Sequence, residues 1–328
     1  MKLRVDGFIL ALLLVIILAY LFPQGAAYRG GAPLEVISAI GISLIFFFYG
    51  LKLSFAEIGS GLKNWRLHLF VQATTFLLFP LLILVFKPFV STPSQFDFWL
   101  SFFFLAALPS TVSSSVVLVS IARGNVPAAI LNASISGLIG VLLTPLWMAL
   151  FIDFKTDNVF AEVYWGLIRE IIIPVILGLA LQRYWGIWAQ RHKANISLFD
   201  KSVILLIVYG SFAESFLSGV FEKVTHTYLV SVLVGTIVLF FLVYGVTYLL
   251  SRYVFRFSRE DHIAGIFCGS KKSLTHGSVF GKFIFVNNPT VGLYFLPLML
   301  YHAFQIFVIT LIAQRYGKST TLEDPKHN

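Results

Sequence analysis

Two adjacent lysines stand in an apolar part of the chain. Lys271 and Lys272 lie within residues 268–277, a mostly small and polar interruption. A helix that enters the membrane near Asp261 would place Lys271 about 15 Å deep at about 1.5 Å per residue, halfway through a core about 30 Å thick. Each lysine there costs about 2.5–3.5 kcal/mol. We expect both to face protein or a wet cavity, unless one reaches the membrane surface.

These ammonium groups have several possible roles. They could bind an anionic substrate, pair with a carboxylate or stand in for a metal cation. A desolvated lysine that releases its proton would also allow proton coupling. Glu214 is one of two carboxylates well inside the apolar segments and is our preferred counter-ion for the pair. The alternative is that Glu214 lies near the end of its segment and meets water.

A run of hydroxyl side chains follows Pro109. Proline removes one helical hydrogen bond and clashes with the preceding turn, and carbonyls freed inside a membrane need new partners. The hydroxyls could only repair the backbone or let helices pack closely. They could also form, with unwound carbonyls, a site for a substrate or for a hard cation such as sodium. The run contains Ser110, Thr111, Ser113, Ser114 and Ser115.

Other polar residues in the apolar segments are few. Asn132, Ser136 and Gly140 share one face of a predicted helix. That face either lines a site beside the first interruption or allows close helix packing. Gln72 is a single amide that a hydrogen bond to a neighbouring helix could satisfy.

Membrane-spanning helices must position all of these side chains. The 328 residues are 58% hydrophobic and only 12% charged, against about 25% charged in ordinary soluble domains, and their mean hydropathy is +0.87. This composition excludes a soluble enzyme, a nucleic-acid-binding domain and a disordered protein. Ten segments are long and apolar enough to span a membrane. They are residues 7–23, 34–51, 67–86, 97–122, 126–151, 161–183, 202–219, 228–250, 261–286 and 290–314.

Lysine and arginine are distributed unevenly between the two predicted sides. Of the 24 basic residues, 16 fall on the side of the N terminus, five on the opposite side and three within spans. Basic residues collect in cytoplasmic loops. We therefore predict an integral protein of a bacterial inner membrane with both termini in the cytoplasm, and the net charge of +9 requires no nucleic-acid partner. The first segment could instead be a secretory signal peptide, but nine further spans favour a first spanning helix.

The two halves of the chain share one order of features. In each half a polar interruption is followed by an apolar stretch, a tight turn and a long helix that contains proline. Five spans in each half would give the halves opposite orientations. Inverted repeats with paired broken helices are a known plan for secondary transporters, with the site where the breaks meet. We predict one transporter domain over residues 1–328, with repeats at about 7–151 and 161–314 and a cytoplasmic tail at 315–328.

Signatures of other chemistry are absent from the sequence. There is no Walker loop, GxSxG, HExxH or dinucleotide fingerprint in a suitable context, so an ATP-driven pump or a hydrolase is unsupported. His226 and His302 are isolated and lack metal-ligand spacing. Cys268 is the only cysteine, so no intrachain disulfide is possible. We predict no enzyme activity and no cofactor, except that sodium could bind.

Five motifs along the chain form a recognisable series: FYGLKLS at 48–54, WRLH at 65–68, PSTVSS at 109–114, ARGN at 122–125 and GSKKS at 269–273. Together they resemble the SBF-like branch of the bile acid:sodium symporter family. They occur in the expected order, and the resemblance covers about residues 40–310. It implies a ten-helix fold of two inverted five-helix repeats. A core domain would carry two crossing broken helices, the fourth and ninth, and a panel domain would move against it.

The resemblance implies a sodium site that this chain matches only in part. Sodium-coupled members hold the ion beside the fourth-helix break with a Ser-Asn pair, and here Ser113 and Ser114 occupy the matching place. Ala129 and Ala133 stand where fifth-helix hydroxyl ligands are expected. The third-helix glutamine matches Gln72. An amide and two hydroxyls of the family's ligand set are therefore replaced.

The ninth helix departs furthest from the family pattern. A Glu-containing stretch is expected there, but residues 267–272 hold no carboxylate, and Lys271 lies near the place of a glutamine ligand. A lysine there would repel sodium and could replace it. The predicted cation-binding or coupling residues are Gln72, Ser113, Ser114, Asn132, Ser270 and Lys271. The predicted substrate-binding residues are Thr111, Ser115, Lys271, Lys272, Ser273, Thr275 and His276.

We predict from these observations a secondary active transporter of an organic anion, working by alternating access. Its coupling could use sodium, protons or exchange, or there could be no coupling. The alternative is a membrane regulator or receptor that kept the fold and lost sodium-coupled transport. The expected partners are the small anionic solute and membrane lipid, with no nucleic acid.

Overall fold

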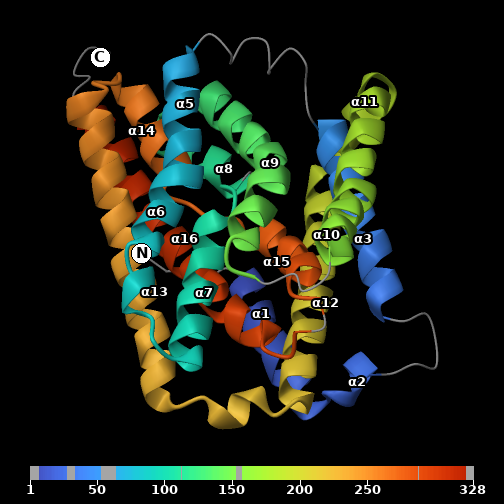
Figure 1. The fold of residues 1–328 in the computed structure, drawn as a ribbon. Coiled ribbons are helices and arrows are strands. Elements are labelled where there is room, and N and C mark those ends of the chain that lie inside the picture. The colour runs from blue at the N-terminus through green and yellow to red at the C-terminus, as the bar shows by residue number, and fades with distance from the viewer. Residues whose placement is uncertain are drawn as a thin grey trace. The chain divides into compact units, whose positions relative to one another are not determined.

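The computed structural model describes residues 7–27, 34–52, 64–111, 113–152, 157–286 and 288–322. Within these ranges the regular structure is helical throughout, with no strand, which confirms the predicted all-α class (Figure 1). The described helices overlap each of the ten predicted segments, and two of the segments contain a break.

Six described helices are long and apolar enough to cross a membrane. Two shorter apolar helices, Gly7–Leu21 and Val36–Lys52, coincide with the first two predicted spans. The predicted spans 97–122 and 261–286 are each divided into two shorter helices. The chain is therefore a multi-pass helical membrane protein. The six long helices are Trp65–Phe89, Val126–Ala149, Ala161–Arg191, Lys193–Leu217, His226–Val254 and Val291–Lys318.

The helices form two compact units, and each unit takes segments from both predicted repeats. The first unit comprises Met1–Ser54, Met148–Leu229 and Thr275–Leu296. The second unit comprises Phe55–Trp147, Val230–Leu274 and Pro297–Asn328.

The first unit contains one very close helix pair. Helix α3 runs beside α11 (Figure 1). A Cβ atom on Gly50 would collide with the Val175 carbonyl oxygen, and one on Gly178 with the Phe47 carbonyl oxygen. We call this contact the glycine seam, because small residues let helix backbones approach. The elements of this unit are α1 (Gly7–Leu21), α2 (Gln24–Ala27), α3 (Leu34–Lys52), α10 (Asp157–Leu167), η4 (Ile168–Ile172), α11 (Ile173–Arg191), α12 (Lys193–Leu217) and η5 (Val220–Lys223).

The second unit contains both divided helices. Its elements are α5 (Trp65–Ala73), η2 (Thr74–Leu78), α6 (Phe79–Leu84), η3 (Lys87–Phe89), α7 (Pro93–Ala107), α8 (Ser113–Ile121), η6 (Leu250–Val254) and α14 (Arg259–Gly269). Four helices have residues in both units: α9 (Val126–Ala149), α13 (His226–Leu249), α15 (Leu274–Ile284) and α16 (Val291–Leu322).

Two π-helical segments precede prolines. In η2 the Phe79 N–H donates to the Thr74 carbonyl, one residue further back than in an α-helix, and Pro80 follows. In η4 the Ile173 N–H donates in the same way to Ile168, and Pro174 follows. Proline has no N–H, so each segment leaves a carbonyl without its usual helical donor. Such π segments occur often at functional sites.

Both predicted interruptions are confirmed, and both are shorter than predicted. Helix α7 ends at Ala107, the Leu108 backbone is extended with ψ 153°, and α8 begins at Ser113. Helix α14 ends at Gly269 and α15 begins at Leu274. We call Leu108–Thr111 the first break and Ser270–Ser273 the second break. Ser113–Ser115 and Thr275–Gly277, predicted as parts of the interruptions, begin the next helices instead.

Candidate substrate and coupling site

The two breaks contact each other within the second unit. The Ser273 N–H donates to the Pro109 carbonyl oxygen at 2.9 Å. The Ser110 hydroxyl donates to the Cys268 carbonyl oxygen at 2.6 Å. Each break therefore supplies hydrogen-bond partners for backbone groups that the other leaves unpaired, as a low-dielectric interior requires.

Lys272 is held by backbone oxygens alone. Its Nζ atom lies 2.8 Å from the Thr75 oxygen, 2.6 Å from the Ala106 oxygen and 2.7 Å from the Leu108 oxygen. The Phe79 ring centroid lies 4.0 Å from the same atom. The side chain is completely buried. All three donors of the ammonium are used, and we call the three oxygens the carbonyl cage.

The local sequence explains why these three carbonyls are available. The Thr75 oxygen lacks its helical donors because Phe79 bonds to Thr74 and Pro80 has no N–H. The Ala106 oxygen would accept from Ser110 in a continuous helix, but the Ser110 N–H donates to the Ser136 hydroxyl at 3.0 Å. Leu108 lies beyond the end of α7. The cage therefore consists of helix-end and π-segment carbonyls, which carry partial negative charge.

The backbone of Lys272 is fixed by a buried glutamine. The Lys272 N–H donates to Gln305 Oε1 at 2.8 Å, and Gln305 Nε2 donates to the Lys272 carbonyl at 2.7 Å. The Tyr301 hydroxyl donates to the Ser270 carbonyl at 2.8 Å. The Ser270 hydroxyl donates to the Ile266 carbonyl at 2.6 Å. Helix α16 therefore fixes the backbone of the second break at Ser270 and Lys272.

Lys271 is equally buried but has far fewer partners. Its Nζ atom donates to the Ser114 hydroxyl at 3.2 Å, and the described residues offer it no second hydrogen bond. Ser114 donates in turn to Thr111, and the Thr111 and Ser115 hydroxyls are 2.9 Å apart. No ion pair in the described ranges involves either Lys271 or Lys272. Lys271 thus presents two buried donors to whatever occupies this region.

The polar face of α9 lies against the first break. Ser136 accepts the Ser110 N–H, and a Cβ atom on Gly140 would lie 2.8 Å from the Pro109 ring. Gln72 Nε2 donates to the Asn132 backbone oxygen at 3.1 Å and lies 3.4 Å from its side-chain oxygen. The Gln72 Oε1 atom is buried without a hydrogen-bond partner.

The remaining predicted site residues lie elsewhere. The side chain of Ser113 is outside the part of the chain that the structure describes. Thr275 and His276 belong to the first unit, where the His276 ring contacts the rings of Phe46, Tyr49 and Phe280. Ser273 lies in the second break, and its backbone N–H donates to the Pro109 carbonyl of the first break. Glu214 also belongs to the first unit, and its role as counter-ion to the lysines stays a prediction.

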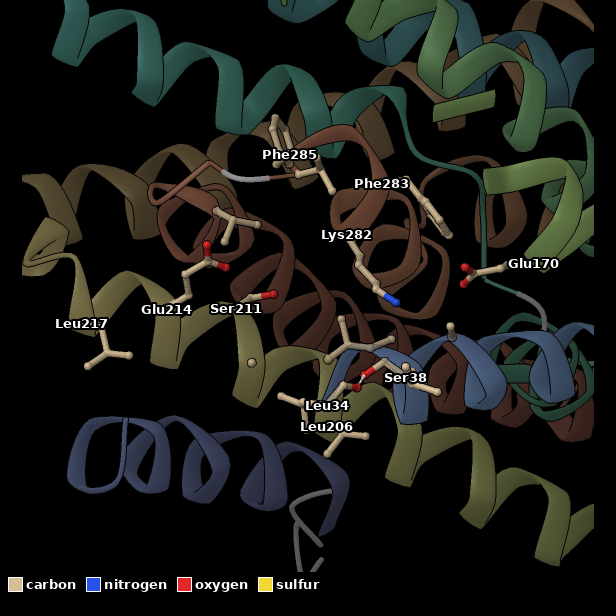
Figure 2. Close-up of a pocket in the computed structure, with 16 residues that line it drawn as sticks. Leu34, Ser38, Glu170, Leu206, Ser211, Glu214, Leu217, Lys282, Phe283 and Phe285 are labelled. Carbon is tan, nitrogen blue, oxygen red and sulfur yellow. Dashed lines mark hydrogen bonds between the residues drawn. The ribbon is translucent and has the colours of Figure 1, made fainter. Parts of the chain in front are cut away.

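A cavity of about 670 Å³ lies wholly within the first unit. Figure 2 shows Lys282 between the carboxylates of Glu170 and Glu214, among mainly apolar side chains. Glu170 is 7% exposed, and its Oε1 atom lies 3.7 Å from a guanidinium nitrogen of Arg169. Its Oε2 atom has no hydrogen-bond partner. A volume of this size with a few polar groups suits an amphipathic small molecule.

Sequence reasoning missed several of these residues. Gln305 and Tyr301 were hidden within a long apolar helix, although a glutamine in a predicted span is itself a signal. The residue type of Thr75 gives no sign that its backbone carbonyl is free to accept a hydrogen bond. The only indication in the sequence is Pro80, which lies inside the predicted span 67–86 and has no N–H to donate.

The residues at the second break do not fit a bound sodium ion. Backbone oxygens of the kind that bind a hard cation are present, but the Lys272 ammonium is within 2.8 Å of all three. A second ammonium, that of Lys271, takes the Ser114 hydroxyl. The unpartnered Gln72 oxygen is one potential ligand beside the first break, and one oxygen does not make a cation site.

Buried charge at paired broken helices defines a class of protein. Two discontinuous helices that meet in a multi-pass helical protein, with lysines at the meeting point, are typical of a transporter. The chain belongs to the SBF-like CPA transporter family, whose model matches residues 6–318. It is a transporter rather than an enzyme, and an integral multi-pass membrane protein.

Known relatives match nearly the whole chain. An uncharacterized protein of Pseudomonas aeruginosa is 40% identical over 95% of this chain and 93% of its own length. The Escherichia coli protein named "Putative symporter YfeH" is 35% identical over 96% and 94%. Sodium/bile acid cotransporter 7-B of Xenopus laevis is 31% identical over 94% and 90%.

The carbonyl cage makes a testable prediction about Pro80. Removing a proline from a helix interior ordinarily stabilises a protein, by up to about 3 kcal/mol. In Pro80→Ala the restored N–H would bond to the Thr75 carbonyl and compete with Lys272. We expect the melting temperature in detergent to stay the same or fall.

Pro174→Ala is the matched control, because it changes the same π-segment arrangement where no lysine hydrogen bond is involved. It should be neutral or stabilising. A clear rise in melting temperature for Pro80→Ala would show that Lys272 does not depend on the Thr75 carbonyl.

Proposed function

We propose that the chain is a secondary active transporter of an amphipathic organic anion that works by alternating access. The observation that carries this proposal is Lys271, a fully buried ammonium with a single hydrogen bond among the described residues, located where two helix breaks meet. A charge in such a place is costly and is retained in membrane proteins for function. A carboxylate or sulfonate would satisfy its remaining donors.

We also propose the finer topology. The chain would cross a bacterial inner membrane ten times as two inverted five-helix repeats, with both termini in the cytoplasm. The distribution of basic residues supports this orientation. Cys268 is the only cysteine and is buried, so single cysteines introduced into the loops can be labelled in intact cells with an impermeant maleimide. Labelling of loops rich in lysine and arginine from outside would contradict the orientation.

Coupling to sodium is the least supported of the three couplings that the sequence leaves open. The ammonium groups at the second break repel a cation and use the oxygens that would bind one. Exchange of one anion for another, or proton coupling through Lys271, requires no metal site. We therefore propose transport that does not need sodium.

Flux through reconstituted protein tests the proposal. Proteoliposomes would be loaded with cholate, an alkyl sulfonate or an aromatic carboxylate, and entry of the labelled compound would be followed in sodium or choline buffer. We expect exchange above that of protein-free vesicles in both buffers. No flux with any anion, together with a partner protein that stays bound through purification, would favour the regulator or receptor.

The cavity of the first unit supplies a second prediction about the solute. The unpartnered Glu170 oxygen can accept a hydrogen bond from a hydroxyl or amine of a bound molecule. A hydrogen bond to a charged group is worth about 1.5–3 kcal/mol. We expect Glu170→Gln to raise the KM for the transported solute about tenfold or more, with little change in melting temperature.

Glu222→Gln is the control, since Glu222 is exposed and does not line the cavity. Its KM should equal that of the unchanged protein. Equal KM values for all three proteins would exclude the cavity from solute binding.

A further inference from the structure

The carbonyl cage has the properties of a site for a small monovalent cation. Three oxygens converge on one point at 2.6–2.8 Å, a distance suited to charged hydrogen bonds. Two of them belong to the C-terminal end of α7, where the helix dipole favours positive charge. The face of the Phe79 ring, 4.0 Å away, attracts a cation as well.

The carbonyl cage is neutral, which favours an occupant with a single positive charge. Every hydrogen-bond partner of the Lys272 ammonium in the described ranges is a neutral carbonyl, and no carboxylate there pairs with it. Divalent ions such as Ca²⁺ bind sites that contain carboxylates and six to eight oxygens. Three neutral carbonyls and an aromatic ring suit a cation with a single charge, because such an ion loses its water at a low cost in free energy.

We propose that the Lys272 ammonium is a tethered cation, occupying a monovalent cation site that becomes available to free ions when the side chain is removed. The covalent stem makes the cation a permanent part of the fold. This inference deepens the proposed function, because it explains how the family architecture can dispense with an external ion. It rests on the carbonyl cage and not on flux.

The comparison with Lys271 separates a tethered cation from a merely buried lysine. Both side chains are fully buried and adjacent in sequence. Lys272 donates to three backbone oxygens, whereas Lys271 donates to one hydroxyl at 3.2 Å. Removing Lys271 therefore uncovers no set of convergent oxygens, and it is the matched control for removing Lys272.

The test measures thermal stability of detergent-purified protein at constant ionic strength. Lys272→Ala, Lys271→Ala and the unchanged protein are titrated with potassium, ammonium, methylammonium or sodium chloride in place of choline chloride. We expect Lys272→Ala to melt lower than the unchanged protein in choline. Small monovalent cations should then raise its melting temperature saturably, by about 2 °C or more. The unchanged protein and Lys271→Ala should show no such cation-specific rise.

Three results would overturn the proposal. The first is a folded Lys272→Ala protein that responds to no cation more than to choline. The second is an unchanged protein with a saturable response equal to that of Lys272→Ala, which would place a cation site elsewhere. If Lys272→Ala cannot be purified, the titration is run on Lys272→Ser. Aggregation of both variants in every salt is the third, because an ion that filled the cage would rescue them. None of these measurements depends on transport. A failure of the proposed transport function can therefore be distinguished from a failure of the tethered-cation proposal.

Discussion

Lys271→Met should lower anion flux through the reconstituted protein about tenfold or more at low solute concentration, while leaving the folded state as stable as before. Methionine matches the length of the lysine stem and carries no charge. A buried ammonium with one hydrogen bond of 3.2 Å gains little from its surroundings, and replacing poorly paired buried charge by an apolar side chain is often neutral or stabilising. The anionic group of the solute, however, would lose its charged partner, at a cost of about tenfold or more in affinity.

Two measurements check this expectation on one preparation: the exchange rate in proteoliposomes and the melting temperature in detergent. Lys272→Met is the matched control, since it changes the neighbouring lysine in the same way. It should lower the melting temperature strongly, because three buried carbonyls lose the ammonium that donates to them. Full exchange activity in Lys271→Met would remove Lys271 from the transport site. A large loss of stability would instead make its role structural.

Gln305→Leu should be among the most destabilising single substitutions in the second unit. The Gln305 side chain is completely buried and pairs with both the N–H and the carbonyl of Lys272. Leucine would leave two buried backbone groups unsatisfied, at about 1–3 kcal/mol each. The second break would also lose the contact that orients Lys272 toward the carbonyl cage. We expect a melting temperature lower by several degrees.

Gln72→Leu provides the comparison for this change. The Gln72 amide donates at 3.1 and 3.4 Å to Asn132, and its oxygen has no hydrogen-bond partner. Losing it should therefore cost much less than losing Gln305. Equal melting temperatures for the two leucine variants would show that Gln305 does not hold the second break.

The positions of the helices were predictable from the sequence, because they depend on the lengths of its apolar segments. In the described residues eight of the predicted spans match unbroken helical segments, and the other two are helical on either side of breaks that Pro109 and Ser270 mark. The lengths of the breaks were overestimated because polar residues were assigned to them. Ser114 and Thr275 lie in helices, since hydroxyl side chains are tolerated in the first turn of a helix.

The different hydrogen-bond partners of the two lysines were not predictable from the sequence. Lys271 and Lys272 are adjacent and of one type, so no sequence pattern says which one meets carbonyls and which meets a hydroxyl. That difference depends on backbone oxygens of Thr75, Ala106 and Leu108, which become available only through helix ends and a π segment. Backbone groups of this kind leave no trace in residue type, apart from a nearby proline.

The glycine seam has a practical consequence for following motion in this protein. Because backbone meets backbone at Gly50 and Gly178, no side chain separates α3 from α11 at that point. We expect the two helices to keep their separation there, since backbone atoms cannot repack as side chains do. A pair of spin labels, one on the exposed face of each helix, would give a distance that stays constant through a transport cycle. That distance is an internal reference for the distances to labels elsewhere in the chain.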